Sequence, residues 1–165
     1  MTFHSTKAPR PPLHFILLLS VVIFVGCQTV PQPPDPARVL MNAAILRETP
    51  GNYFFGRRMF KKDYKMWGWV REPGMPWKSA KLVMMNEQRM IAPDRASGKL
   101  GVDNNYDYRL EGAFSGDMVY EPASDKFYPE FVLTGYELIR TNPPSIYIVD
   151  KQLDPAIRII NTPVE

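Results

Sequence analysis

Histidine and cysteine are nearly missing from this chain, and the few that occur lie close to its beginning. Among 165 residues, His4 and His14 are the only histidines and Cys27 is the only cysteine. A single cysteine cannot form a disulfide within the chain. Beyond Cys27 the sequence therefore lacks the side chains for Ser-His-Asp triads, Cys-His pairs and zinc sites built on imidazole or thiolate.

The remaining composition is that of a folded domain. Hydrophobic residues make up 45% and charged residues 22%, which argues against a wholly disordered chain, and the length suits one domain with one core. The 17 prolines and 10 glycines indicate many turns. No phosphate-binding glycine loop, nucleophile elbow or dinucleotide fingerprint occurs, so we expect no cofactor.

The chain begins with the pattern of a secretory signal. Residues 1–12 contain Lys7 and Arg10 and no acidic residue. An apolar run, interrupted only by His14 and Ser20, extends from there to Val25. A basic segment followed by a short apolar run is typical of signal peptides.

The end of this run resembles the lipobox of bacterial lipoprotein precursors. The matching residues are Val25, Gly26 and Cys27, and Phe24 stands where that family more often has Leu, Val or Ile. The resemblance implies that residues 1–26 are removed and that Cys27 is lipidated. It thus implies a protein of the bacterial cell envelope, anchored in the membrane through its N-terminal lipid and exposed outside the cytoplasm.

Two points about the anchor stay open. An uncleaved membrane anchor is the alternative, because the apolar stretch counted from Leu13 to Val30 approaches the length of about 20 residues that a transmembrane helix needs. Gln28 after the cysteine resembles lipoproteins directed to the outer membrane, but sorting rules vary among bacteria. The sequence leaves the choice between inner and outer membrane unresolved.

A tether and a helix are predicted after the cysteine. Residues 28–36 include four prolines, so residues 27–35 are expected to form an extended tether. A helix is predicted over residues 36–48, with Asp35 as its N-cap and Pro36 in its first turn. Its expected role is to pack against the domain that follows.

Strands dominate the rest of the chain. A hairpin is indicated where the turn at residues 72–74 separates two apolar runs, and alternation of apolar and polar residues marks a half-buried strand near residue 110. A long surface loop is predicted over residues 91–105. Strands are predicted, in order, at residues 66–71, 80–85, 106–115, 119–120 and 131–139. The β domain would span residues 49–142, followed by a Pro-punctuated extension over residues 143–165.

These elements predict a mostly β fold: a small antiparallel OB-like barrel or sandwich preceded by one short α-helix. Glycines lie inside two of the strands, at Gly68 and Gly135, where barrel strands bend. The segments Trp67–Val70 and Thr134–Ile139 loosely resemble the first and last strands of OB-fold barrels. This resemblance covers about 75 residues, from Tyr64 to Ile139.

Basic and aromatic residues are concentrated in one part of the chain. Residues 27–165 carry 18 basic and 17 acidic residues, yet residues 50–82 alone hold eight basic and two acidic ones. Cations interleaved with aromatic rings can bind polyanionic chains or stack on the rings of a ligand. In an envelope protein the candidate ligands are glycans, anionic lipid headgroups and proteins. Nucleic acid is not expected as a partner. The alternative, favoured on general grounds, is that the aromatics fill the core. The candidate binding surface comprises Arg57, Arg58, Lys61, Lys62, Lys65, Trp67, Trp69 and Trp77.

A partial calcium-loop pattern is formed by Asp103, Asn105 and Asp107, because alternate oxygen-bearing side chains can wrap one hard cation. The pattern stops there. Tyr108 stands where an EF-hand needs glycine, and Phe114 stands at the twelfth position. A turn in which asparagine side chains cap backbone groups explains the same residues.

The leading functional hypothesis is a noncatalytic binding or assembly module for a protein or glycan. The alternative is a glycan-processing enzyme that uses two carboxylates, one as an acid and one as a base or nucleophile. The nearest such cluster is Glu121, Asp125 and Glu130. Nothing in their spacing requires them to face each other across a cleft, so we expect no catalytic activity.

Overall fold

The computed structural model describes residues 1–2 and 35–164. The predicted signal segment from residue 3 onward, Cys27, and the tether as far as residue 34 lie outside the described residues. In the part that is described, no helix combines the length and the hydropathy needed to cross a membrane.

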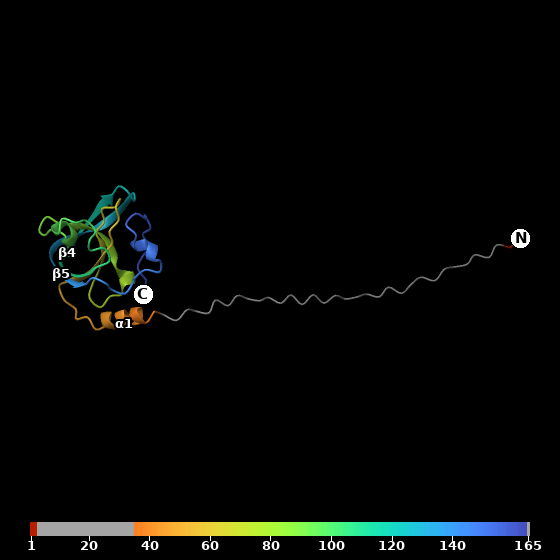
Figure 1. The fold of residues 1–165 in the computed structure, drawn as a ribbon, viewed down its shortest axis with the longest axis horizontal. Helices are drawn as coiled ribbons and strands as arrows, with labels where there is room; N and C mark the ends of the chain where they lie inside the picture. Colours follow the sequence, from red (N-terminus) through yellow and green to blue (C-terminus); the bar gives the residue numbers. More distant parts are fainter. Residues whose placement is uncertain (3–34, 165) are drawn as a thin grey trace. The chain divides into compact units, whose positions relative to one another are not determined.

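Five strands close into a barrel (Figure 1). They are β1 (Phe54–Arg58), β2 (Gly68–Arg71), β3 (Lys81–Asn86), β4 (Asp107–Glu121) and β5 (Lys126–Arg140). Around the barrel the order is β1-β2-β3-β5-β4, and β4 pairs with β1 to complete the ring. Every neighbouring pair is antiparallel except β3 and β5, which are parallel. The predicted OB-like barrel is thus confirmed.

The helix α1 (Pro36–Ile45) precedes the barrel, as predicted, and ends three residues before the predicted boundary. The Asp35 side chain accepts a hydrogen bond from the N–H of Ala37 at 3.0 Å, and Pro36 occupies the first turn, where its missing N–H needs no partner. The remaining helices are short: η1 (Trp77–Ser79), α2 (Pro93–Ala96) and η2 (Asp150–Leu153).

The barrel strands bury side chains on both faces, which creates two hydrophobic cores. Successive side chains of a strand point to opposite faces, so Val70 faces the barrel interior and its neighbour Trp69 faces outward. The interior core contains Trp67, Val70, Val83, Ala92, Tyr108, Leu110, Phe131 and Leu133. The outer core contains Met41, Ile45, Met59, Met66, Trp69, Trp77, Ala80, Leu82, Ile146 and Tyr147.

The outer core is covered by the two segments that flank the barrel in sequence. Met41 and Ile45 of α1 pack into it from one side, and Ile146 and Tyr147 of the C-terminal extension pack into it as well. Within the extension the N–H of Val164 donates to the carbonyl of Ile146 at 2.8 Å, and the N–H of Lys62 ties the extension to the barrel by donating to the carbonyl of Pro155 at 3.0 Å. OB folds commonly bind ligands on the face formed by strands 2 and 3. Here the chain itself covers the outer side of that face.

One glycine explains how β1 and β2 approach each other so closely. A Cβ atom added at Gly68 would collide with the carbonyl oxygen of Arg57 and with the backbone of the next two residues. The register places Gly68 directly opposite Arg58. Gly68 is therefore a point of close backbone contact, in agreement with the bend that the sequence indicates there.

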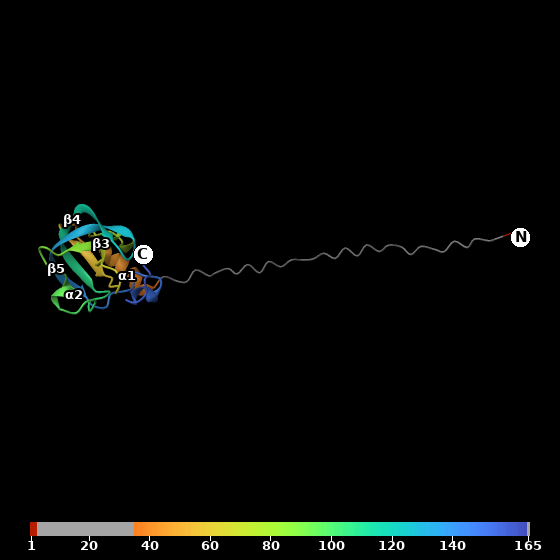
Figure 2. The same ribbon diagram turned by 90° about the horizontal axis from the view of Figure 1, so that it is seen from above.

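The strands β4 and β5 form a hairpin that extends well past the closed part of the barrel. β4 pairs with β1 only as far as Leu110 but with β5 as far as Glu121, and the hairpin bends at irregularities around Gly112 and between Phe114 and Met118. Figure 2 shows the strong curvature of these two strands. The two separate strands predicted at 106–115 and 119–120 are thus one continuous strand.

Candidate functional site

Most of the predicted basic and aromatic surface lies inside the protein. Only Lys62 and Lys65 have exposed side chains. The other six, which are 0 to 6% exposed, are Arg57, Arg58, Lys61, Trp67, Trp69 and Trp77. These six side chains therefore do not form an exposed surface, and the tryptophans fill the core, as the alternative interpretation holds.

Arg57 shows why a buried cation is tolerated here. Its guanidinium holds the Asp107 carboxylate through two contacts, Nε to Oδ1 at 2.6 Å and Nη2 to Oδ2 at 3.0 Å. Nη1 donates to the carbonyl of Pro144 at 2.7 Å, and the guanidinium carbon lies 4.8 Å from the centre of the Trp77 ring. A buried charge needs a partner and satisfied hydrogen bonds, and Arg57 has both.

Arg71, which the sequence analysis did not single out, makes an equivalent pair with Glu48. Both contacts between the guanidinium and the carboxylate are 2.6 Å long. The guanidinium also stacks on Phe55 at 4.5 Å and on Trp77 at 4.8 Å. Trp77 thus stacks on two arginines, and the pair of Arg71 with Glu48 fixes the segment that follows α1 to β2.

Arg58 is shared by two buried carboxylates. Its Nη2 donates to Asp94 at 2.8 Å and its Nε lies 3.6 Å from Asp103. Burial raises the pKa of Asp94, but the Arg58 charge and the hydrogen bonds from Arg58, Gly101 and Arg95 outweigh it, so the Asp94 pKa lies below its ordinary value. Burial dominates at Asp103 and, despite Arg58, raises its pKa. The folded state thus favours the ionised form of Asp94 and disfavours the ionised form of Asp103.

Lys61 ties the C-terminal extension to the barrel. Its Nζ donates to the backbone carbonyls of Gln152 and Asp154, the latter at 2.9 Å. Burial lowers the Lys61 pKa, against the opposing attraction of the Asp154 charge. Lys61 and the three arginines Arg57, Arg58 and Arg71 therefore make hydrogen bonds and ion pairs inside the domain instead of forming an exposed basic surface.

Of the three candidate calcium ligands, the two aspartates are engaged in other contacts. Asp107 is paired with Arg57, and Asp103 accepts a hydrogen bond from the Tyr108 hydroxyl at 3.1 Å. Asn105 has a positive φ of 66°, as expected for a tight turn. Within residues 35–164 no three acidic, histidine or cysteine side chains gather as a metal site would require. The residues therefore form a turn that is tied to two arginines.

The three carboxylates of the enzyme hypothesis each have a separate partner. Glu130 accepts from the Asn86 amide at 2.9 Å, and Asp125 accepts from the Tyr120 hydroxyl at 2.8 Å. Glu121 accepts from the N–H of Ser124 at 2.7 Å. Burial raises the pKa of Glu121, but hydrogen bonds from Ser124, Ala123 and Lys65 outweigh this effect, so the pKa is lowered. A general acid at neutral pH needs a raised pKa instead.

A concave surface lies on the outer face of β4 and β5, and we call it the β4–β5 groove. It consists of a hollow of 450 Å³ and a second one of 330 Å³ that share Glu111 and Thr134. The first is lined by Asn52, Arg89, Glu111, Gly112, Ala113, Val132 and Thr134, and the second by Met90, Arg109, Glu111, Thr134, Gly135, Tyr136 and Glu137. The two hollows fall in the size range of ligand-binding sites.

Two glycines shape the floor of this groove. Gly112 has a φ of 149° at the point where the register between β4 and β5 shifts, a conformation that other residues rarely adopt. An added Cβ at Gly135 would lie 2.8 Å from the Glu111 Oε2 atom, so the carboxylate occupies space that only glycine leaves open.

The groove has balanced charge and unused hydrogen-bonding groups. The two positive charges of Arg89 and Arg109 balance the two negative charges of Glu111 and Glu137. Arg109 also stacks on the Tyr53 ring at 4.3 Å. Among the described residues, no side-chain hydrogen bond or ion pair involves Glu111, Glu137 or Arg89. Their donors and acceptors are available to a ligand. Because the lining residues come from four distant stretches of chain, no local sequence pattern could have revealed the groove.

Comparisons with family models, with curated proteins and with solved structures find no match to this chain.

Proposed function

We propose that this chain is a lipid-anchored protein of the bacterial envelope that acts as a noncatalytic binding module, and that the β4–β5 groove is its site for a glycan. The anchoring part of the proposal rests on the lipobox-like segment that ends in Cys27 and on the Pro-rich tether that follows it. The binding part rests on the groove. A protein partner at this surface is the competing possibility within the same function class.

The groove carries the proposal because its two hollows are open and are lined by polar and charged side chains. The outer side of the usual OB ligand face is closed by α1 and the C-terminal extension. On β4 and β5, one carboxylate, one guanidinium, one amide and one hydroxyl line the larger hollow, and a second carboxylate and a second guanidinium line the smaller one. This mixture of strong acceptors and strong donors is what a chain of sugar hydroxyls requires.

The charge balance narrows the class of ligand. Two arginines and two glutamates leave the groove without net charge, so it offers no strong attraction to a polyanion, whose binding depends on several uncompensated cations. Tyr136, 37% exposed at the groove wall, provides an aromatic surface for stacking. A neutral or zwitterionic glycan satisfies both features.

Glycan binding should depend on Glu111 and on the space above Gly135. We expect Glu111→Gln to weaken retention of the full chain on a bead-bound envelope polysaccharide by about tenfold, because it removes a charge-assisted hydrogen bond. Gly135→Val should have a similar effect without any change of charge, because its side chain displaces the Glu111 carboxylate from the groove floor. The measurement is a series of retention assays on purified envelope polysaccharides, one at a time.

Asp117→Asn is the matched control, because it removes the same charge from an exposed position on the same strand outside the groove. Its retention should equal that of the unmodified chain. The proposed glycan site fails if the chain binds no polysaccharide, or if both groove variants bind as well as the control. Release of soluble sugar fragments during the assay would instead support the enzyme alternative.

A further inference from the structure

The outward face of α1 is apolar although it is exposed. The helix already buries Met41 and Ile45 in the outer core. On the other side, Leu40 is 72% exposed, Val39 49% and Leu46, just past the last turn, 79%. The exposed nonpolar residues are Ala37, Val39, Leu40, Ala43, Ala44 and Leu46, and no charged residue lies between Ala37 and Leu46 except the half-buried Arg38.

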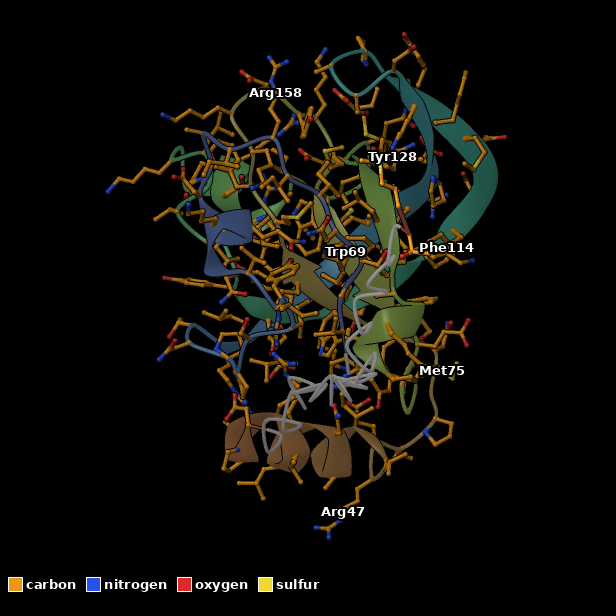
Figure 3. The ribbon with its side chains drawn as sticks, turned by 90° about the vertical axis from the view of Figure 1, so that its right-hand side faces the viewer. Arg47, Trp69, Met75, Phe114, Tyr128 and Arg158 are labelled. Atoms are coloured by element: carbon orange, nitrogen blue, oxygen red, sulfur yellow. The ribbon has the colours of Figure 1, made fainter. Side chains whose placement is uncertain are left out.

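This apolar face continues onto the neighbouring segments. Ile139, 46% exposed, lines a crevice together with Met41 and Ala44, while Gly74 and Pro76 line a second, largely apolar hollow with Leu46. Figure 3 shows α1 crossing one end of the barrel, with Arg47 directed away from it, whereas Tyr128 near the start of β5 lies toward the other end. One end of the domain therefore presents an apolar platform, which we call the α1 platform.

Three arginines surround the α1 platform, against one exposed carboxylate at the N-cap of the helix, Asp35. Arg47 and Arg140 are exposed there, and Arg38 donates to the carbonyl of Tyr147 at its edge. The Glu48 carboxylate is neutralised by its two contacts with Arg71. An apolar helix face with basic residues at its margin is the pattern of helices that lie in a membrane interface. The basic residues also complement anionic headgroups.

The length of chain before α1 places an upper limit on its distance from the anchor. Seven residues lie between Cys27 and Asp35, the N-cap of α1, so eight Cα–Cα steps connect the two. Even fully extended, such a stretch spans only about 28 Å. If Cys27 carries lipid, α1 is therefore the element of the domain whose connection to the bilayer surface is shortest.

We propose that the α1 platform rests on the lipid surface that holds the anchor, with Val39, Leu40 and Leu46 in the interfacial region and Arg47 and Arg140 at the headgroups. This inference rests on the proposed lipid anchor. The contact orients the domain, so that the β4–β5 hairpin turn, at the end away from α1, projects from the membrane.

The test uses the acylated full chain in phospholipid vesicles that contain an anionic lipid, at less than one copy per vesicle on average. Acylation blocks the sulfur of Cys27, the only cysteine, so a thiol introduced by Leu40→Cys is the single site for a fluorescent label. We expect the emission of an NBD label there to shift to the blue and to be quenched by lipids that carry a nitroxide. The matched control is Ala123→Cys, an exposed position in the β4–β5 turn, whose label should stay water-like and unquenched.

The outcomes separate this inference from the anchoring proposal. If the chain floats with the vesicles but the label at residue 40 behaves like the label at residue 123, the anchor stands and the platform contact is overturned. If the blue shift appears only at high protein density and without quenching by lipid, a second copy covers the helix and the lipid contact is again overturned. If the chain carries no lipid and does not float, both proposals fail.

Discussion

Replacing Asp107 with alanine is expected to lower the free energy of unfolding by about 3–5 kcal/mol, the usual effect of removing one partner from a buried ion pair. Arg57 is fully buried, and Asp107 holds two of its guanidinium nitrogens. Without the carboxylate, a charge that cannot reach water keeps only the carbonyl of Pro144 and the face of Trp77. The measurement is equilibrium unfolding in denaturant, compared with the unmodified chain.

The matched control for this prediction is Asp63→Ala. Asp63 also pairs with an arginine, Arg158, at 2.7 Å, but the two side chains are 48% and 63% exposed. Water screens such a pair, so its loss should change stability by less than about 1 kcal/mol. Equal effects of the two substitutions would contradict the internal role that we assign to Arg57.

The two carboxylates around Arg58 are expected to respond oppositely to pH. The folded state lowers the Asp94 pKa, so the contribution of Asp94 is present above its unfolded value of 3.8 and is lost as the pH falls through the lower folded value. The folded state raises the Asp103 pKa, so the contribution of Asp103 is complete below 3.8 and is lost as the pH rises through the folded value.

Amide variants test this difference directly. At pH 7, Asp94→Asn should destabilise the fold by about 2–3 kcal/mol, since it weakens hydrogen bonds that involve a charged partner. The variant should also lose the decline in stability below pH 3.8. Asp103→Asn should become more favourable, relative to the unmodified chain, as the pH rises above 3.8. Unfolding curves recorded from pH 3 to 8 measure both trends, and identical trends for the two variants would exclude the assignment.

The sequence predicted the barrel because its strands alternate where only one face is buried and carry glycine where they bend. Tyr108 and Leu110 point inward while Arg109 and Glu111 point to solvent, which is the pattern that the period of two detects. Asp35 and Pro36 likewise predicted the start of α1 through local chemistry. These signals need only neighbouring residues.

The strand β1 is not predicted from the sequence, because its residues lack the alternation of apolar and polar side chains. Its residues Phe54 to Arg58 have no alternation, because both faces of the strand are covered and because two of the covered positions are arginines. An arginine is buried only when carboxylates from elsewhere reach it, and Asp94 and Asp107 are 36 and 50 residues away. Because these ion-pair partners are far apart in sequence, the buried arginines resemble a basic surface when the sequence is read alone. The residues that line the β4–β5 groove are also far apart in sequence, so the groove could not be predicted either.

The mass of the native protein's N-terminal fragment tests the central claim, that this domain is held to the envelope by lipid on Cys27. We expect a chain that starts at Cys27 and is heavier than its peptide by a diacylglyceryl group and one further acyl chain, and a Cys27→Ser variant that is found outside the membrane fraction. An unprocessed chain that retains Met1 and has a free thiol at Cys27 would contradict the account.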